Sequence, residues 1–212
     1  MSLKRAFRAD SLVPLEDRLV LSTSAQHVTA LVATLTPGVT ATTVPASRRD
    51  ALRFEVDFLK GMIPHHQMAI RMAQIEVRNG SDPAVVGLAR RIISEQTPEL
   101  HRMQSWLSSG LGIRNFRPRM SADDMKMLGD LNALKGTDLD RAFLTDMIDH
   151  HKRAISGDGM MPGANDCLDK AVHTSLRQLC SNIVTSQSGE IQEMQTDLAR
   201  LDGMPTGTRM GN

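Results

Sequence analysis

The 212-residue chain contains two copies of one pattern, and this internal repeat limits the folds available to it more than any other feature. The segment 58–70 recurs 85 positions later as 143–155, and the segment 88–107 recurs 91 positions later as 179–198. Six residues are therefore added inside the second copy, and the glycine-rich stretch 157–163 is the expected place of this insertion. Each copy is predicted to be a hairpin of two helices. Two such hairpins make a four-helix bundle.

The apolar spacing supports an all-α fold. Apolar residues recur at intervals of three, four and seven from Leu52 onward, and no strand pattern appears. Ser81, Asp82 and Pro83 carry the capping residue and early proline that open a second helix. A short connecting helix is expected around residues 123–134.

We expect the bundle domain to span residues 48–203. Its first repeat covers 48–110 and its second 137–203. Thr137 followed by Asp140 resembles a helix-capping start.

Residues 1–47 differ from the rest of the chain. No charged residue occurs from Ser22 to Ser47, and Pro37-Gly38 interrupts this stretch. We expect a disordered or export-related leader. The segment is too polar for an ordinary signal peptide, and it contains no apolar run long enough to span a membrane. Residues 15–22 resemble a short signature found on many exported bacterial proteins, which implies secretion or a cell-envelope location.

The composition argues against several functions. Twenty-five basic residues balance 24 acidic ones, so no overall field favours nucleic acid. No nucleophile–base pair, phosphate loop or dinucleotide fingerprint is visible, so a non-enzymatic role is favoured over a metalloenzyme. The 14 methionines stand out in a chain without tyrosine, because methionine both fills core gaps and supplies a soft metal ligand.

Candidate metal ligands share helix faces in the first repeat. At about 100° per residue, His65 falls with Met62 and Met72 on the apolar face of the first helix. Gln96, Glu99 and Met103 fall together on the apolar face of the second. Since equal distances from the Gly80-Ser81 turn place His65 beside Gln96, we expect these side chains to meet in the interior.

The second repeat carries the same elements. His150, His151 and Met147 match the first helix, and Gln187, Glu190 and Met194 match the second. Two arrangements are open there because of the insertion. Either the turn lies further along the chain and keeps Gln187 beside His150, or the helices shift and His173 takes that level. The first is favoured because the Gln-x-x-Glu-x-x-x-Met pattern is retained.

The ligand types favour copper. Thioether and imidazole suit copper, above all the cuprous ion, whereas zinc would use His with Glu99 or Glu190 and is the weaker candidate. No histidine has Glu three residues before it, which argues against carboxylate-bridged di-iron chemistry. The alternative from another class is a structural or interaction bundle whose His-Gln-Glu network is a polar core without metal.

The segment Met62-Ile63-Pro64-His65-His66-Gln67-Met68, with the later Gln96-x-x-Glu99-x-x-x-Met103, resembles domain-of-unknown-function family 305. The likeness covers roughly residues 54–200. It implies a ferritin-like fold, export, and for some members copper or silver binding and copper tolerance. The resemblance also implies the metal-ligand set Met62, His65, His66, Met68, Met72, Met103, Met147, His150, His151 and Met194.

The second copy departs from the family pattern, because Gly157 stands in the place of Met72. A second site would therefore be poorer in sulfur. Cys167 and Cys180 would lie about 20 Å apart on one continuous helix, so two buried free thiols are slightly favoured over a disulfide. Export would permit pairing. Homo-oligomerisation stays open.

Overall fold

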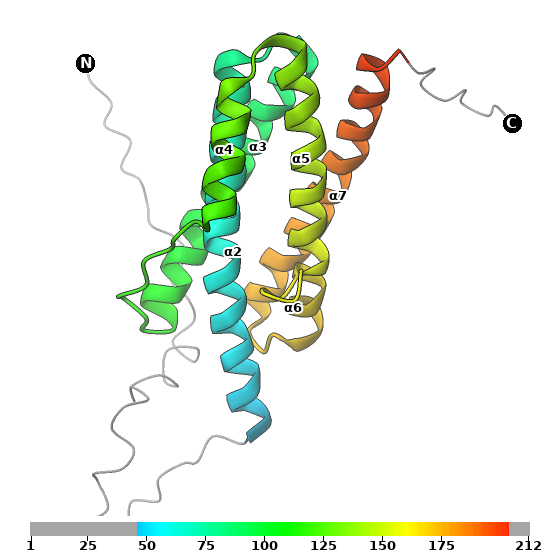
Figure 1. Ribbon diagram of the computed structural model, residues 1–212. Helices are drawn as coiled ribbons and strands as arrows, with labels where there is room; N and C mark the ends of the chain where they lie inside the picture. The colour runs from blue at the N-terminus through cyan, green and yellow to red at the C-terminus, as the bar shows by residue number, and fades with distance from the viewer. Residues whose placement is uncertain (1–45, 204–212) are drawn as a thin grey trace, which may run out of the picture.

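The structure is a computed structural model that describes residues 46–203, and within this range every regular element is a helix. Figure 1 shows the long helices running side by side along the bundle. This confirms the all-α class and the two-hairpin architecture. In chain order the elements are α2 (Ala46–Asn79), α3 (Pro83–Ser105), the π-helix η1 (Trp106–Gly110), α4 (Ala122–Ala133), α5 (Gly136–Ser156), α6 (Ala164–Lys170) and α7 (Thr174–Leu201).

The first hairpin turns as the sequence predicts. Helix α2 ends at Asn79, and the side chain of Asp82 caps α3 by accepting hydrogen bonds from the backbone N–H groups of Ala84 and Val85. Pro83 occupies the first turn, where its missing N–H leaves no donor without a partner. The connecting helix α4 lies within one residue of its predicted range.

The insertion in the second repeat divides its first helix into two. Helix α5 ends at Ser156, and the non-helical loop 157–163 leads to the short helix α6. Gly157 has φ +76°, a conformation in which any side chain would be strained. Since Lys170 lies 91 positions after Asn79, α6 replaces the last two turns of α2. The turn of the second hairpin therefore lies further along the chain, as the favoured arrangement requires.

Each hairpin is fastened to the turn of the other by a buried carboxylate. Asp140 of α5 accepts hydrogen bonds from the N–H groups of Ser81 and Asp82 at 2.9 and 3.1 Å. Glu55 of α2 accepts the equivalent bonds from Val172 and His173 at 2.8 and 2.9 Å. The two clamps occupy matching positions of the repeat, so the hairpins hold each other reciprocally.

The start of α5 differs from the one predicted from the sequence. The helix begins at Gly136 after Lys135, which makes no side-chain capping bond. Asp140 is fully buried and bonds to the other hairpin instead of to its own first turn. Its acidic character was noted from the sequence, but its partner lies 59 residues away.

Cys167 and Cys180 form a disulfide, so the expectation of free thiols was wrong. That expectation assumed one continuous helix, whereas Ala171–His173 separates α6 from α7 and brings the two Cα atoms to 6.1 Å. The bond ties the short α6 to α7, and both sulfur-bearing residues are fully buried.

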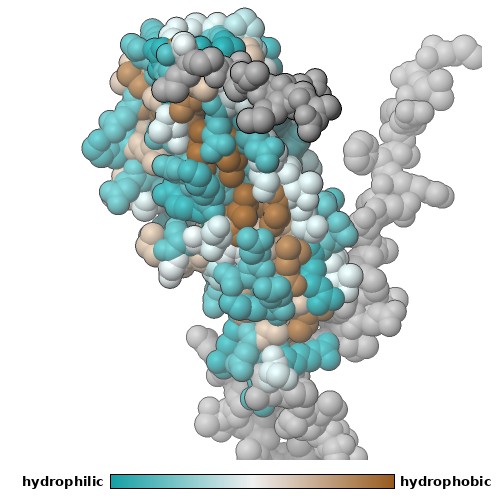
Figure 2. Space-filling view, turned by 90° about the vertical axis from the view of Figure 1, so that its right-hand side faces the viewer, coloured by the Kyte–Doolittle hydropathy of each residue, from teal (hydrophilic) through white to brown (hydrophobic). Residues whose placement is uncertain are grey.

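A polar layer divides the bundle core into two apolar clusters. One cluster contains Phe58, Met62 and Met103 together with α6 and the start of α7. The other contains Met68, Phe143 and Met147 with the upper parts of α2 and α3. Figure 2 shows the apolar side chains as a narrow brown stripe between polar flanks. The histidines of the repeat lie between the two clusters along α2 and α5.

The leader predicted for residues 1–47 lies almost wholly outside the described residues, and α2 begins at Ala46. The bundle ends with α7 at Leu201, close to the predicted boundary at 203. Among the described helices, none combines the length and apolarity needed to cross a membrane.

Candidate metal centre

Four imidazoles from two helices form the middle of the polar layer. His65 and His66 lie on α2, and His150 and His151 lie on α5. His66 and His151 are fully buried, and His150 is 2% exposed. Both ring nitrogens of His65 are buried, although part of the residue reaches the surface. The paired histidines of both repeats therefore meet in one interior.

The central contact is between the two repeats. The rings of His65 and His150 face each other with 3.5 Å between their centroids and 33° between their planes. None of their four ring nitrogens has a hydrogen-bond partner within the described residues. A buried polar atom without a partner is destabilising by about 1–3 kcal/mol, so this pair is a poor choice for packing alone.

The outer imidazoles are each held by a carboxylate of the same hairpin. His66 Nε2 lies 3.0 Å from Glu99 Oε2, and His151 Nε2 lies 2.8 Å from Glu190 Oε2. In both pairs the other ring nitrogen, Nδ1, is buried and makes no hydrogen bond. A carboxylate that fixes one imidazole nitrogen and leaves the other free is the usual support of a metal-bound histidine.

The glutamines of the repeat complete the layer. Gln96 and Gln187 are 2% and 1% exposed, and neither amide has a hydrogen-bond partner among the described residues. The predicted neighbours His65 and Gln96 thus share the layer, but they form no hydrogen bond with each other. The side-chain hydrogen bond between α2 and α3 in this layer joins His66 to Glu99 instead.

The methionines approach the layer from opposite sides. Met62 and Met103 belong to the cluster below it, whereas Met147 and Met194 belong to the cluster above it. All four are fully buried. Each hairpin therefore contributes one pair of buried thioethers, and the two pairs lie in different apolar clusters.

Met72 lies on the predicted face of α2 but far from Met62. Ten residues of helix separate them by about 15 Å, and they belong to different apolar clusters. The two thioethers cannot bind the same ion. Met68, 3% exposed, lies in the upper cluster with Met72.

Burial keeps the central imidazoles neutral. Desolvation lowers the pKa of His65 well below its usual range, and the neighbouring rings of His66 and His151 lower it further. Desolvation and the ring of His65 act on the pKa of His150 in the same direction. The neutral form is the one that binds metals.

A third buried histidine–glutamate pair, between His173 and Glu55, was missed from the sequence. His173 Nδ1 lies 2.6 Å from Glu55 Oε2, and the Trp106 ring meets the His173 ring edge-on at 5.3 Å. His173 lies at the position of Asp82 in the repeat, and Glu55 at that of Asp140. The repeat offsets align these positions, but they do not by themselves predict that Glu55 contacts His173.

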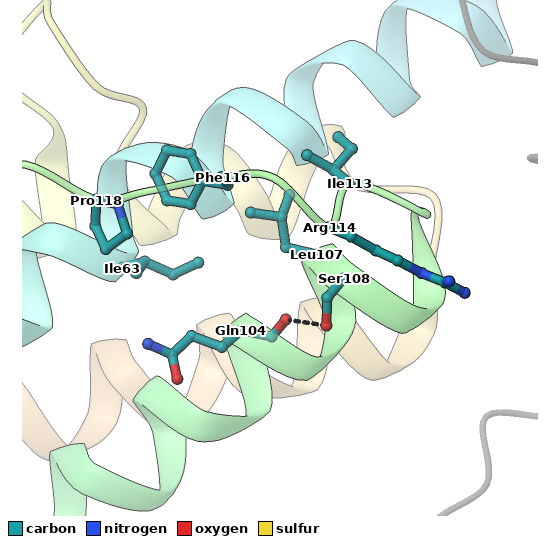
Figure 3. Close-up of a pocket in the computed structure, with 8 residues that line it drawn as sticks. All are labelled: Ile63, Gln104, Leu107, Ser108, Ile113, Arg114, Phe116 and Pro118. Carbon is teal, nitrogen blue, oxygen red and sulfur yellow. Dashed lines mark hydrogen bonds between the residues drawn. The ribbon is translucent and has the colours of Figure 1, made fainter.

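Two further observations restrict which side chains could form a metal site. Among residues 46–203, no group of three or more His, Cys, Asp or Glu side chains is arranged to hold a metal ion. A surface pocket under the 111–121 connector is lined by no imidazole or thioether (Figure 3). Its lining comprises Ile63, Gln104, Leu107, Ser108, Ile113, Arg114, Phe116 and Pro118. Within the described residues, His, Cys, Asp and Glu side chains alone therefore do not supply three ligands to one point in the layer.

The fold and this layer define a class of all-helical bundles built from two fused hairpins around buried His-His pairs. The family described as "Domain of unknown function (DUF305)" matches residues 38–107 and 55–198. The chain belongs to this family.

Similar proteins support the assignment. The uncharacterized protein L153 of Acanthamoeba polyphaga mimivirus is 42% identical over 64 residues, which are 30% of this chain and 42% of that protein. The match therefore spans less than half of that relative. A DUF305 fragment from Deinococcus radiodurans is 27% identical with a TM-score of 0.58, over 69% of this chain and 95% of the fragment.

CopM is similar to the same degree. Its Cu(I)-bound form is 29% identical with a TM-score of 0.56, over 69% of this chain and 95% of CopM. Solved structures of CopM also include Cu(II)-bound and silver-bound forms.

Proposed function

We propose that this protein is an exported copper-binding bundle that sequesters the ion or passes it on, and thereby contributes to copper tolerance. The observation that carries the proposal is the set of buried imidazole nitrogens without hydrogen-bond partners, in a layer flanked by buried thioethers. Imidazole and thioether together suit copper better than zinc, magnesium or calcium. The similarity to CopM, which has been solved with copper and with silver, supports the same ligand.

The ligands come from both hairpins. His65 and His150 offer nitrogens between the hairpins, while His66 and His151 offer the Nδ1 atoms that their carboxylates leave free. The flanking thioethers of the two hairpins are those of Met62, Met103, Met147 and Met194. Gln96 and Gln187 supply amide groups to the layer, and Met68 and Met72 remain more distant candidates.

The disulfide supports the proposed location. Disulfides form and persist in oxidising compartments, whereas the cytosol keeps thiols reduced. The buried Cys167–Cys180 bond therefore suits secretion or the cell envelope. Cysteines held in a disulfide do not bind copper, so the ion would depend on histidine and methionine.

Metal analysis tests the proposal directly. The protein is purified without chelator and without a metal affinity resin, after expression in copper-supplemented medium. We expect copper to co-purify and zinc to be nearly absent. Copper-free protein that also fails to take up Cu(I) in titration would support the rival, a polar core that only sets helix register.

A further inference from the structure

The loop inserted into the second hairpin carries two adjacent methionines in very different surroundings. Met160 is 92% exposed. Met161 is partly buried and packs against the lower apolar cluster, which contains Met62 and Met103. Neither belongs to the repeated pattern, since both lie in the insertion within residues 157–163.

The loop has a defined conformation. One carboxylate oxygen of Asp158, Oδ1, accepts hydrogen bonds from the backbone N–H groups of Met160 and Met161 at 2.9 and 3.0 Å. Gly157 and Gly159 have φ values of +76° and +83°, which residues with a side chain rarely adopt. The exposure of Met160 is therefore set by a specific turn.

The side chain of Met161 packs against α2 at Gly61. A Cβ atom placed on Gly61 would lie 2.6 Å from Met161 Cβ and 3.4 Å from its sulfur, so only glycine permits the contact. Gly61 directly precedes Met62, a thioether of the candidate centre. The inserted loop thus carries sulfur from the molecular surface to the helix that bears His65 and His66.

A buried centre needs a route for its ion, and the pocket of Figure 3 offers neither sulfur nor imidazole along its walls. We propose that Met160 and Met161 form a capture site for a soft monovalent ion, Cu(I) or Ag(I), and transfer it through Met62 to the polar layer. This inference rests on the proposed copper-binding function and adds the path of uptake.

The chemistry is ligand exchange. Each thioether donates a lone pair to the ion, and the next thioether replaces the one before it, so no electron is transferred and no protein bond breaks. Neutral thioethers favour soft ions. A pair of exposed or half-exposed thioethers holds an ion less completely than a closed site, which suits transfer better than storage.

The test compares rates of uptake in the full chain. Stopped-flow absorbance follows Cu(I) leaving a chromogenic chelator for wild-type protein and for M160L, M161L and the double variant. Leucine removes the sulfur and keeps the volume nearly unchanged. Met125, 57% exposed on α4, provides the matched control M125L. A second variant, G61A, keeps both sulfurs but displaces the loop from α2.

The double variant and G61A should load at least about threefold more slowly, while M125L loads at the wild-type rate. Equilibrium affinity, measured after full loading, should stay within about threefold of wild type. Wild-type loading rates in the double variant would overturn the inference and leave copper binding intact. Wild-type protein that takes up no Cu(I) at all would overturn the proposed function and the capture site together.

Discussion

His65 of the first repeat and His150 of the second lie ring against ring, with 3.5 Å between their centroids. The contact joins equivalent positions, so it lies between the hairpins and holds two buried imidazoles where neither has a hydrogen-bond partner among the described residues. Two apolar side chains would pack there without the cost of desolvating four nitrogens. The pair therefore favours ligand binding over stability.

Replacing both rings with leucine tests this trade-off. The double substitution His65→Leu with His150→Leu removes four buried ring nitrogens that have no hydrogen-bond partner among the described residues. The free energy of unfolding of the metal-free protein should therefore stay within about 1 kcal/mol of wild type, or rise. Chemical denaturation followed by the fluorescence of Trp106 measures it. A loss above about 3 kcal/mol would show that the imidazoles stabilise the fold themselves.

The disulfide should contribute measurably to stability. Cys167 and Cys180 close a loop with a sequence separation of 13, for which the chain-entropy estimate is about 3 kcal/mol. Denaturation with and without a reductant measures the difference. The double variant C167A, C180A serves as the control, because its stability should not respond to reductant.

Glu76 should make the stability of the fold fall as the pH rises through the acid and neutral range. Burial raises its pKa to about 8, together with the nearby carboxylate of Asp140. Since its pKa is higher in the folded state than the ordinary 4.5, the folded protein binds the extra proton, and stability falls as pH rises from about 4.5 to about 8.

The variant E76Q isolates this effect. A neutral amide cannot ionise, so the variant should lose the component of the pH slope between pH 5 and 8 that amounts to at most about 1.4 kcal/mol per pH unit. Denaturation midpoints across this range provide the measurement. Parallel pH profiles for wild type and E76Q would mean that Glu76 keeps its charge when folded.

The carboxylate clamps of Asp140 and Glu55 should contribute more to the free energy of unfolding than ion pairs on the surface do. Asp140→Ala leaves the N–H groups of Ser81 and Asp82 without their acceptor, so the free energy of unfolding should fall by about 1–3 kcal/mol or more. Asp130, which pairs with Lys126 in solvent, is the control, and D130A should cost less than about 1 kcal/mol.

Local patterns and the repeat predicted the helices, the Asp82 cap and the shared layer of histidines and glutamines. Long-range relations were harder to predict, because α6 and its turn depend on how the inserted loop folds. That turn brings Cys167 to Cys180 and Glu55 to His173. The separation of Met62 from Met72 follows from the rise of the helix alone. The sequence argument considered only their common helix face and not their distance along the helix axis.

Competition for Cu(I) tests the central claim most directly. Wild-type protein, the double variant His65→Ala with His150→Ala, and the control His101→Ala, whose imidazole is exposed on α3, are titrated against a chromogenic Cu(I) chelator. We predict that wild type and the control bind Cu(I) with equal affinity and that the double variant binds at least about tenfold more weakly, roughly 1.4 kcal/mol. Equal affinity in all three proteins would contradict a copper centre in the polar layer.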